Sequence, residues 1–148
     1  MAKLVIIYHS HSGNTEKMAE EVAQGARAVK GVEVVSRRVE MATNEDLTSS
    51  SGIIIGSPTY FRQMAAELKS FIDKSIDIYG KLGGKIGGVF SSSGSREDGK
   101  KCLTSLYEAL DCHGVKVIGK VLALEAPGEK EREECRRLGE KVARLILT

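Results

Sequence analysis

The sequence "KLVIIYHSHSGNTEKMA", residues 3–19, joins an apolar run to a helical pattern through a loop of small polar residues. The run at 3–8 has the length and the branched side chains of a buried strand. After the loop, Met18, Val22 and Ala26 repeat at helical spacing. A strand followed at once by an amphipathic helix begins a βαβ unit. The segment therefore predicts an α/β protein, in which a ligand site belongs at the carboxyl ends of the strands.

Four further apolar runs predict strands, and they lie at 32–35, 52–56, 85–90 and 115–124. Amphipathic patterns separate or follow them, with the apolar members Met64, Leu68, Phe71 and Ile72, then Leu103, Leu106, Tyr107 and Leu110, then Leu138, Val142, Leu145 and Ile146. The polar stretch at 40–50 predicts only a turn or two of helix. Residues 33–40 are mixed in character and suit an edge strand. We expect one domain, residues 1–148, with a doubly wound five-stranded parallel sheet and helices on both faces.

Composition excludes several classes of protein. Lys and Arg number 22 against 20 Asp and Glu, a net charge of +2, which is too nearly neutral for nucleic acid or an anionic membrane as the main partner. No signal-peptide pattern and no apolar span of about 18 residues occur, so we expect a soluble, cytoplasmic protein. Cys102, Cys112 and Cys135 have no clustered spacing, which predicts reduced thiols and no metal site.

The loop after the first strand is suited to an anion. Hydroxyl and amide side chains stand just before a helix N-terminus, where free backbone N–H groups favour a phosphate. No Lys or Arg lies inside the loop, so hydrogen bonds alone would hold the charge, as suits one bound phosphomonoester. The alternative is a simple Ser or Asn helix cap. The candidate residues are Ser10, Ser12, Gly13, Asn14 and Thr15.

Other phosphate and catalytic motifs are absent from the sequence. It contains no Walker A motif, no G-x-G-x-x-G and no G-x-S-x-G. A phosphorelay receiver domain would need acidic residues after the first strand and an Asp closing the third. The sequence has "HSHSGN" at 9–14 and "GSPTY" at 56–60 instead.

Three segments carry a resemblance to a known family. The pattern S-x-S-G-N-T-E at 10–16 resembles the flavodoxin loop that binds the FMN phosphate. "GSPTYF" at 56–61 resembles the loop that contacts the isoalloxazine ring, especially in the WrbA-like NAD(P)H:quinone oxidoreductases, and "VFSSSGSREDGK" at 89–100 resembles the second flavin loop. The resemblance implies strand order 2-1-3-4-5 and FMN as the cofactor. Flavin N5 would then carry the chemistry, with no catalytic side chain.

The resemblance also assigns roles within the two flavin loops. Tyr60 and Phe61 would form an aromatic wall for the ring, although packing beneath the third helix is the alternative, favoured for Phe61. Pro58 would fix the backbone, and Thr59 would direct its N–H or hydroxyl toward the ring. Small residues would let the main chain approach the pyrimidine edge, and these are Ser91, Ser92, Ser93, Gly94 and Gly99.

The three histidines receive weaker assignments. His11 takes a place where flavodoxins usually carry a hydroxyl residue, and it would either donate to the phosphate or point to solvent. His113 precedes Gly114 near a helix end and is expected to be a cap or a surface residue. We assign no role to His9.

Flavin binding leaves two functions open. The first is two-electron reduction of a quinone or related acceptor by NAD(P)H through FMN; the second is a flavodoxin that carries single electrons between redox protein partners. Flavodoxins are typically acidic and usually cover the ring with a second aromatic, whereas this chain is nearly neutral, has Arg62 and Arg96 in the flavin loops, and has no aromatic at 91–100. These features and the "GSPTYF" motif favour the enzyme.

Two expectations follow from that choice. Flavodoxins usually stabilise the one-electron state through a peptide flip that needs positive φ, and residues 59–63 contain neither Gly nor Asn, so we expect the flipped state to cost about 1 kcal/mol or more and the one-electron state to lose support. WrbA-like proteins are generally longer and tetrameric. The shorter chain leaves a homo-oligomer as an open alternative.

Overall fold

The computed structural model describes residues 1–148 and contains one five-stranded sheet. Every neighbouring pair of strands is parallel, and the order is β2-β1-β3-β4-β5, which confirms the predicted topology. The strands are β1 (Ala2–Tyr8), β2 (Val32–Arg38), β3 (Gly52–Pro58), β4 (Ile86–Ser93) and β5 (Lys116–Leu124).

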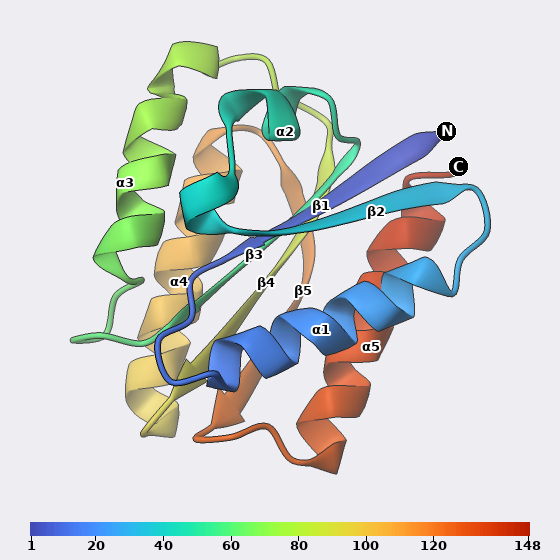
Figure 1. Ribbon diagram of the computed structural model, residues 1–148. Helices are drawn as coiled ribbons and strands as arrows, with labels where there is room; N and C mark the ends of the chain where they lie inside the picture. Colours follow the sequence, from blue (N-terminus) through green and yellow to red (C-terminus); the bar gives the residue numbers. More distant parts are fainter.

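Helices cover both faces of the sheet (Figure 1). One face carries α1 (Asn14–Arg27) and α5 (Glu129–Leu145), and the other carries α3 (Ala66–Lys74) and α4 (Arg96–Cys112). The polar stretch after β2 forms a 3-10 turn, η1 (Val39–Met41), and the five-residue α2 (Asn44–Thr48), as its composition predicts. A second 3-10 turn, η2 (Ser75–Ile78), follows α3.

Alternating side chains of the central strands fill two cores. In β1, Leu4 and Ile6 pack with α1 and α5, whereas Val5 and Ile7 pack with α3 and α4, and all four are fully buried. Burial on both faces explains the continuous apolar runs of the central strands. The edge strand β2 contains a mixture of half-buried and exposed residues, and its place at the edge of the sheet is as predicted.

The carboxyl ends of β1, β3 and β4 lie at one edge of the sheet, where the chain leaves for α1, α3 and α4 (Figure 1). The chain runs from β1 to the outer strand β2 and returns on the other side of β1 to form β3. Such a reversal of strand order opens a crevice between the loops that follow β1 and β3. None of the helices has the length and apolar content needed to span a bilayer.

Candidate functional site

The loop at 9–13 places unpaired backbone donors at the start of α1. Gly13 stands immediately before the helix with φ of 99°, a conformation that glycine adopts without strain. The Ser10 hydroxyl accepts a hydrogen bond from the Glu16 N–H at 3.2 Å. The backbone N–H groups of 12–15 donate to no group of the protein. Together with the helix N-terminus, they form a nest for an anion.

A cation that the loop sequence does not contain lies beside it. Arg38, at the end of β2, donates from Nη2 to the Ser10 carbonyl at 2.7 Å and pairs through Nη1 with Glu16 at 3.2 Å. Its guanidinium also lies 5.6 Å from the centre of the Tyr8 ring. Arg38 stands opposite Tyr8 in the β1–β2 register, so strand pairing is the signal that could have identified it. Arg38 fixes the loop from outside, while Glu16 offsets its charge.

The predicted phosphate-loop side chains separate into two groups. Thr15 is buried, and its hydroxyl lies 2.9 Å from that of Ser92, so this pair joins the first loop to the one after β4. Ser12 and His11 are exposed, Asn14 is half-buried, and their side chains make no hydrogen bond within the protein. These three are therefore free to meet a ligand, whereas Thr15 acts first as a link between loops.

Residues 60–63 form a two-residue hairpin turn at the end of the loop after β3. Tyr60 and Gln63 exchange both backbone hydrogen bonds at 3.0 Å. The two residues between them have positive φ, 51° at Phe61 and 68° at Arg62, as a type I′ turn requires. The loop thus already adopts positive φ at two residues for which the sequence predicts it to be unfavourable. The two backbone hydrogen bonds between Tyr60 and Gln63 close the turn in this conformation against the local preference.

The hairpin holds its aromatic side chains toward solvent. Phe61 is fully exposed and Tyr60 is 40% exposed, so the alternative of packing Phe61 beneath α3 is wrong. Arg62 pairs through Nε with Asp98 in the first turn of α4 at 2.9 Å. Its charge is thus directed to a carboxylate, and of the two predicted loop cations only the exposed Arg96 is without an ion pair.

Several hydroxyls predicted to face a cofactor instead join β3 to β4. The Thr59 and Ser91 hydroxyls lie 2.9 Å apart, and Ser91 donates to the Ser57 carbonyl at 2.7 Å. Thr59 also donates its N–H to the Ser92 carbonyl at 2.9 Å. Ser91 is fully buried, and the Pro58 carbonyl accepts from the Ser57 hydroxyl at 2.8 Å. This network aligns the two loops side by side.

The remaining residues of the β4 loop differ in position. Ser93 closes a local turn, because its hydroxyl donates to the Ser95 carbonyl at 2.7 Å, and the exposed Gly94 lies between the two. Gly99 is not in the loop. It is buried inside α4, where an added Cβ would lie 2.4 Å from a Leu122 methyl carbon. The prediction that Gly99 lets the main chain approach the pyrimidine edge is therefore wrong, since this glycine lets α4 pack against β5.

The other two histidines are both buried. His113 caps the C-terminus of α4, as predicted, but it is not a surface residue. Its Nε2 lies 2.8 Å from the Ser75 hydroxyl, and burial lowers the pKa of His113 below its ordinary value. His9 contacts Glu40 and Glu67, which sequence reasoning did not associate with it.

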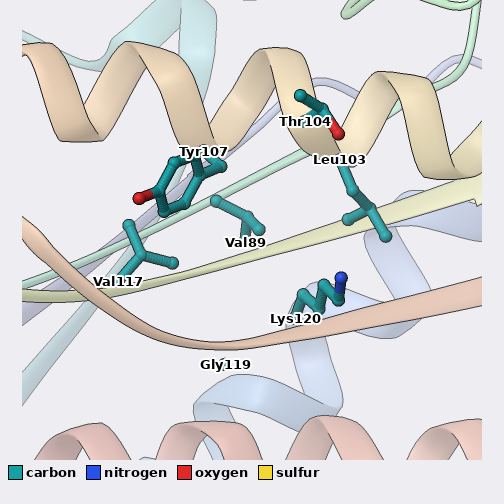
Figure 2. A pocket seen from close by; sticks show the side chains of 7 residues that line it. All are labelled: Val89, Leu103, Thr104, Tyr107, Val117, Gly119 and Lys120. Carbon is teal, nitrogen blue, oxygen red and sulfur yellow. The ribbon is translucent and has the colours of Figure 1, made fainter.

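A cavity of about 410 Å³ lies away from these loops, between α4 and the edge strand β5 (Figure 2). It contains none of the predicted site residues. Its lining consists of Val89, Leu103, Thr104, Tyr107, Val117, Gly119 and Lys120. The polar groups described above lie close together at the carboxyl ends of the strands and not at this cavity. The candidate site is therefore the crevice between the loops.

Comparisons with known proteins agree with this geometry. A family model described as NADPH-dependent FMN reductase matches residues 39–128. A flavodoxin of Aquifex aeolicus (strain VF5) is 38% identical over 162 residues, which cover 99% of this chain and 88% of the relative. The family match begins after the phosphate loop, so the whole-chain relative and the geometry support that part of the site.

Two solved structures share the whole fold. A flavodoxin from the domain Archaea has a TM-score of 0.86 at 28% identity, with 99% of both chains covered. A WrbA-like flavodoxin from Agrobacterium tumefaciens has a TM-score of 0.89 at 26% identity, with 99% of this chain and 98% of that chain covered. The sheet order, the anion nest and these matches agree. The chain belongs to the flavodoxin-like family of FMN-binding proteins.

Proposed function

We propose that this protein is an FMN-dependent oxidoreductase that transfers two electrons from NAD(P)H to a quinone or a related acceptor. The observation that carries the proposal is that aromatic side chains stand on only one side of the crevice. Tyr60 and Phe61 project from the hairpin after β3, whereas the loop at 92–95 contains only serine and glycine. A flavin ring lined by aromatics on one side only leaves space for a second planar molecule to stack.

The residues present fit FMN, which supplies hydride transfer when bound. The N–H groups of 12–15 and the Ser12 hydroxyl would hold the phosphate at the helix N-terminus. Pro58, Thr59 and Tyr60 would border the ring, and the main chain of 92–94 would meet its polar edge. Of the wider predicted set, Ser10, Thr15 and Ser91 would support the contacting groups through their hydrogen bonds.

Steady-state kinetics of the purified, FMN-loaded protein tests the proposal. NADH and NADPH oxidation is measured with and without benzoquinone. We expect oxidation of at least one nucleotide to accelerate strongly when the quinone is present. No oxidation of either nucleotide under any of these conditions would refute an NAD(P)H-dependent enzyme.

The second candidate is a one-electron carrier between protein partners, and one structural observation favours it. The hairpin already holds Phe61 and Arg62 at positive φ, which removes the sequence argument against a peptide flip there. Arg62 is also paired with Asp98, which partly neutralises its positive charge, so Arg62 would stabilise a negatively charged reduced cofactor less. Anaerobic titration with dithionite separates the candidates. The enzyme predicts little one-electron-reduced flavin at half reduction, and the carrier predicts that this form dominates.

The proposed setting is the reducing cytoplasm. The three cysteines are free, with Cys102 and Cys135 buried and Cys112 exposed. Burial raises the pKa of Cys135 to about 12 and also raises that of Cys102, so both buried thiols are unreactive. An unpaired, exposed Cys112 is compatible with a compartment that keeps thiols reduced.

A further inference from the structure

The cavity between α4 and β5 lies at an irregularity of the edge strand. Gly87 and Val89 of β4 pair with Val117 and Lys120 of β5, so β5 has one residue more than its partner at this point. Such an extra residue is a β-bulge, which changes the direction of the side chains around it. Val89, Val117 and Lys120 all line the cavity, which therefore opens where the bulge lies.

The bulge leaves the α4 side of β5 short of side chains. Ile118 packs against the core on the α5 side, and an added Cβ at Gly119 would lie 2.9 Å from a methyl carbon of Leu138 in that same core. Two successive residues thus face α5. On the α4 side, Val117 is followed only by Lys120, and the space between them stays open as the cavity of about 410 Å³.

The lining is mostly apolar and carries a few polar groups. Its apolar part consists of Val89, Leu103, Val117 and the ring of Tyr107, and its polar side chains are Thr104 and Lys120 (Figure 2). Tyr107 is 43% exposed, so part of its ring is free to contact a ligand. A cavity of this volume, with an apolar wall and few polar groups, has the properties of a small-molecule site.

The charge of the lining is positive and has no partner. Lys120 makes no ion pair within the protein, and no acidic residue lines the cavity. Figure 2 shows Lys120 extending from β5 toward α4. The Thr104 hydroxyl donates to the Lys100 carbonyl at 3.1 Å, so its oxygen is left to accept. An anionic group beside the apolar wall would therefore meet an ammonium donor and no repelling carboxylate.

We propose that this cavity binds a small aromatic carboxylate. Its ring would lie among the apolar side chains and against Tyr107, and its carboxylate would accept a hydrogen bond from Lys120. The site shares no residue with the crevice at the carboxyl ends of the strands. The proposal is therefore independent of FMN and of NAD(P)H chemistry.

The test titrates naphthalene-2-carboxylate into the full-length, FMN-loaded protein and follows the methyl groups by two-dimensional NMR. Naphthalene-2-carboxamide is the neutral probe of the same shape, and bound FMN keeps both probes out of the crevice. We expect the largest shifts at Val89, Leu103 and Val117. The carboxylate should bind with a dissociation constant of about 0.1–1 mM, and the amide about three- to tenfold more weakly.

Three variants separate the charge from the cavity. Lys120→Gln should lower the affinity of the carboxylate to that of the amide and leave the amide unchanged. Lys116→Gln is the matched control, because Lys116 is an exposed lysine of the same strand that does not line the cavity, and this variant should keep the preference. Val117→Phe fills part of the space and should weaken both probes about tenfold.

The proposal is overturned if neither probe shifts the cavity methyl groups at millimolar concentration, or if the two probes bind equally to the wild-type protein. It is also overturned if Lys120→Gln keeps the preference, or if Lys116→Gln loses it to the same extent, since the attraction would then belong to the basic surface as a whole. In each case Lys120 would serve only to protect the free edge of β5 from pairing with another chain. Lys120 is exposed, so its variant should fold and the decision does not depend on Val117→Phe.

Discussion

Two loops at the same edge of the sheet reach their shapes by opposite means. In the loop at 9–13 the left-handed residue is Gly13, where an added Cβ would meet no atom within 4 Å. In the hairpin at 60–63 the left-handed residues are Phe61 and Arg62, an aromatic and a long cationic side chain. The first conformation agrees with local preference, and the second is maintained against it.

The difference separates two physical tasks. A loop without strain keeps its N–H groups aligned at no further cost, which suits permanent retention of a charged group. A hairpin that stores strain and exposes Phe61 is more easily rearranged when a neighbouring molecule binds. We infer that the first loop serves retention of the cofactor and that the second serves contacts that change when another molecule binds.

Replacing Gly13 by Ala should produce the largest effect, because an alanine disfavours φ of 99° by about 1–2 kcal/mol and would turn the neighbouring N–H groups. We expect FMN affinity to fall about 100-fold, since several hydrogen bonds to a charged group weaken together. Fluorescence titration of the apoprotein measures this loss, with riboflavin, which lacks the phosphate, as the control. An equal loss for both ligands would mean that Gly13 shapes the whole crevice.

Ser12→Ala and Thr15→Ala should show which hydroxyl of the first loop contacts the FMN phosphate and which one supports the loop. Removing the exposed Ser12 hydroxyl should cost about 1.5–3 kcal/mol of FMN binding, a tenfold or larger drop, and should leave riboflavin binding unchanged. Thr15→Ala leaves the buried Ser92 hydroxyl without its partner at 2.9 Å and should weaken both ligands. The same titrations decide this, and loss of FMN binding alone in Thr15→Ala would show that its hydroxyl contacts the phosphate.

The sequence predicts those features of the fold that a local pattern of residues determines. The five strands, their burial and the alternating helices follow from runs of apolar residues and helical spacing, and Gly13 before a helix follows from its position in the motif. Contacts between distant segments are not encoded in this way. Arg38 reaches Ser10 only because β2 pairs with β1, and nothing near position 9 indicates that two glutamates will surround His9.

The incorrect predictions have the same origin. Gly99 was assigned to a loop because it falls within the segment 89–100 that resembles the second flavin loop, yet it lies in α4 against Leu122. Packing beneath α3 was the favoured alternative for Phe61, which is fully exposed. Positive φ was expected to be unfavourable at 59–63, which contain neither Gly nor Asn, yet Phe61 and Arg62 adopt it. In each case the outcome depends on where the fold places the residue and not on its residue type alone.

Phe61→Gly should stabilise the protein, which would confirm that the hairpin is strained. Glycine relieves the cost of positive φ, and the fully exposed ring contributes no packing, so we expect a gain of about 0.5–1 kcal/mol after the entropy cost of glycine. Phe61→Ala is the matched control, since it removes the ring but keeps the strain and should not stabilise. Urea unfolding of the three proteins measures this. A loss of stability in Phe61→Gly would mean that the ring has a structural partner.

Asp98→Asn should have the smallest effect and should be confined to the hairpin. Arg62 pairs with Asp98 at 2.9 Å, and the carboxylate raises the pKa of Arg62, but both side chains are largely exposed, so the pair contributes little to global stability. It does join the strained turn to the first turn of α4, and without it the turn should open more often. We expect the backbone N–H of Gln63, which donates to the Tyr60 carbonyl, to exchange with solvent about two- to fivefold faster, while the backbone N–H groups in the core of β3 are unchanged.

Raising the salt concentration in the wild-type protein should produce the same local change, because screening weakens an exposed ion pair. If neither treatment alters the exchange of Gln63, the hairpin is held by its two backbone hydrogen bonds alone, and the strain is balanced within the turn itself.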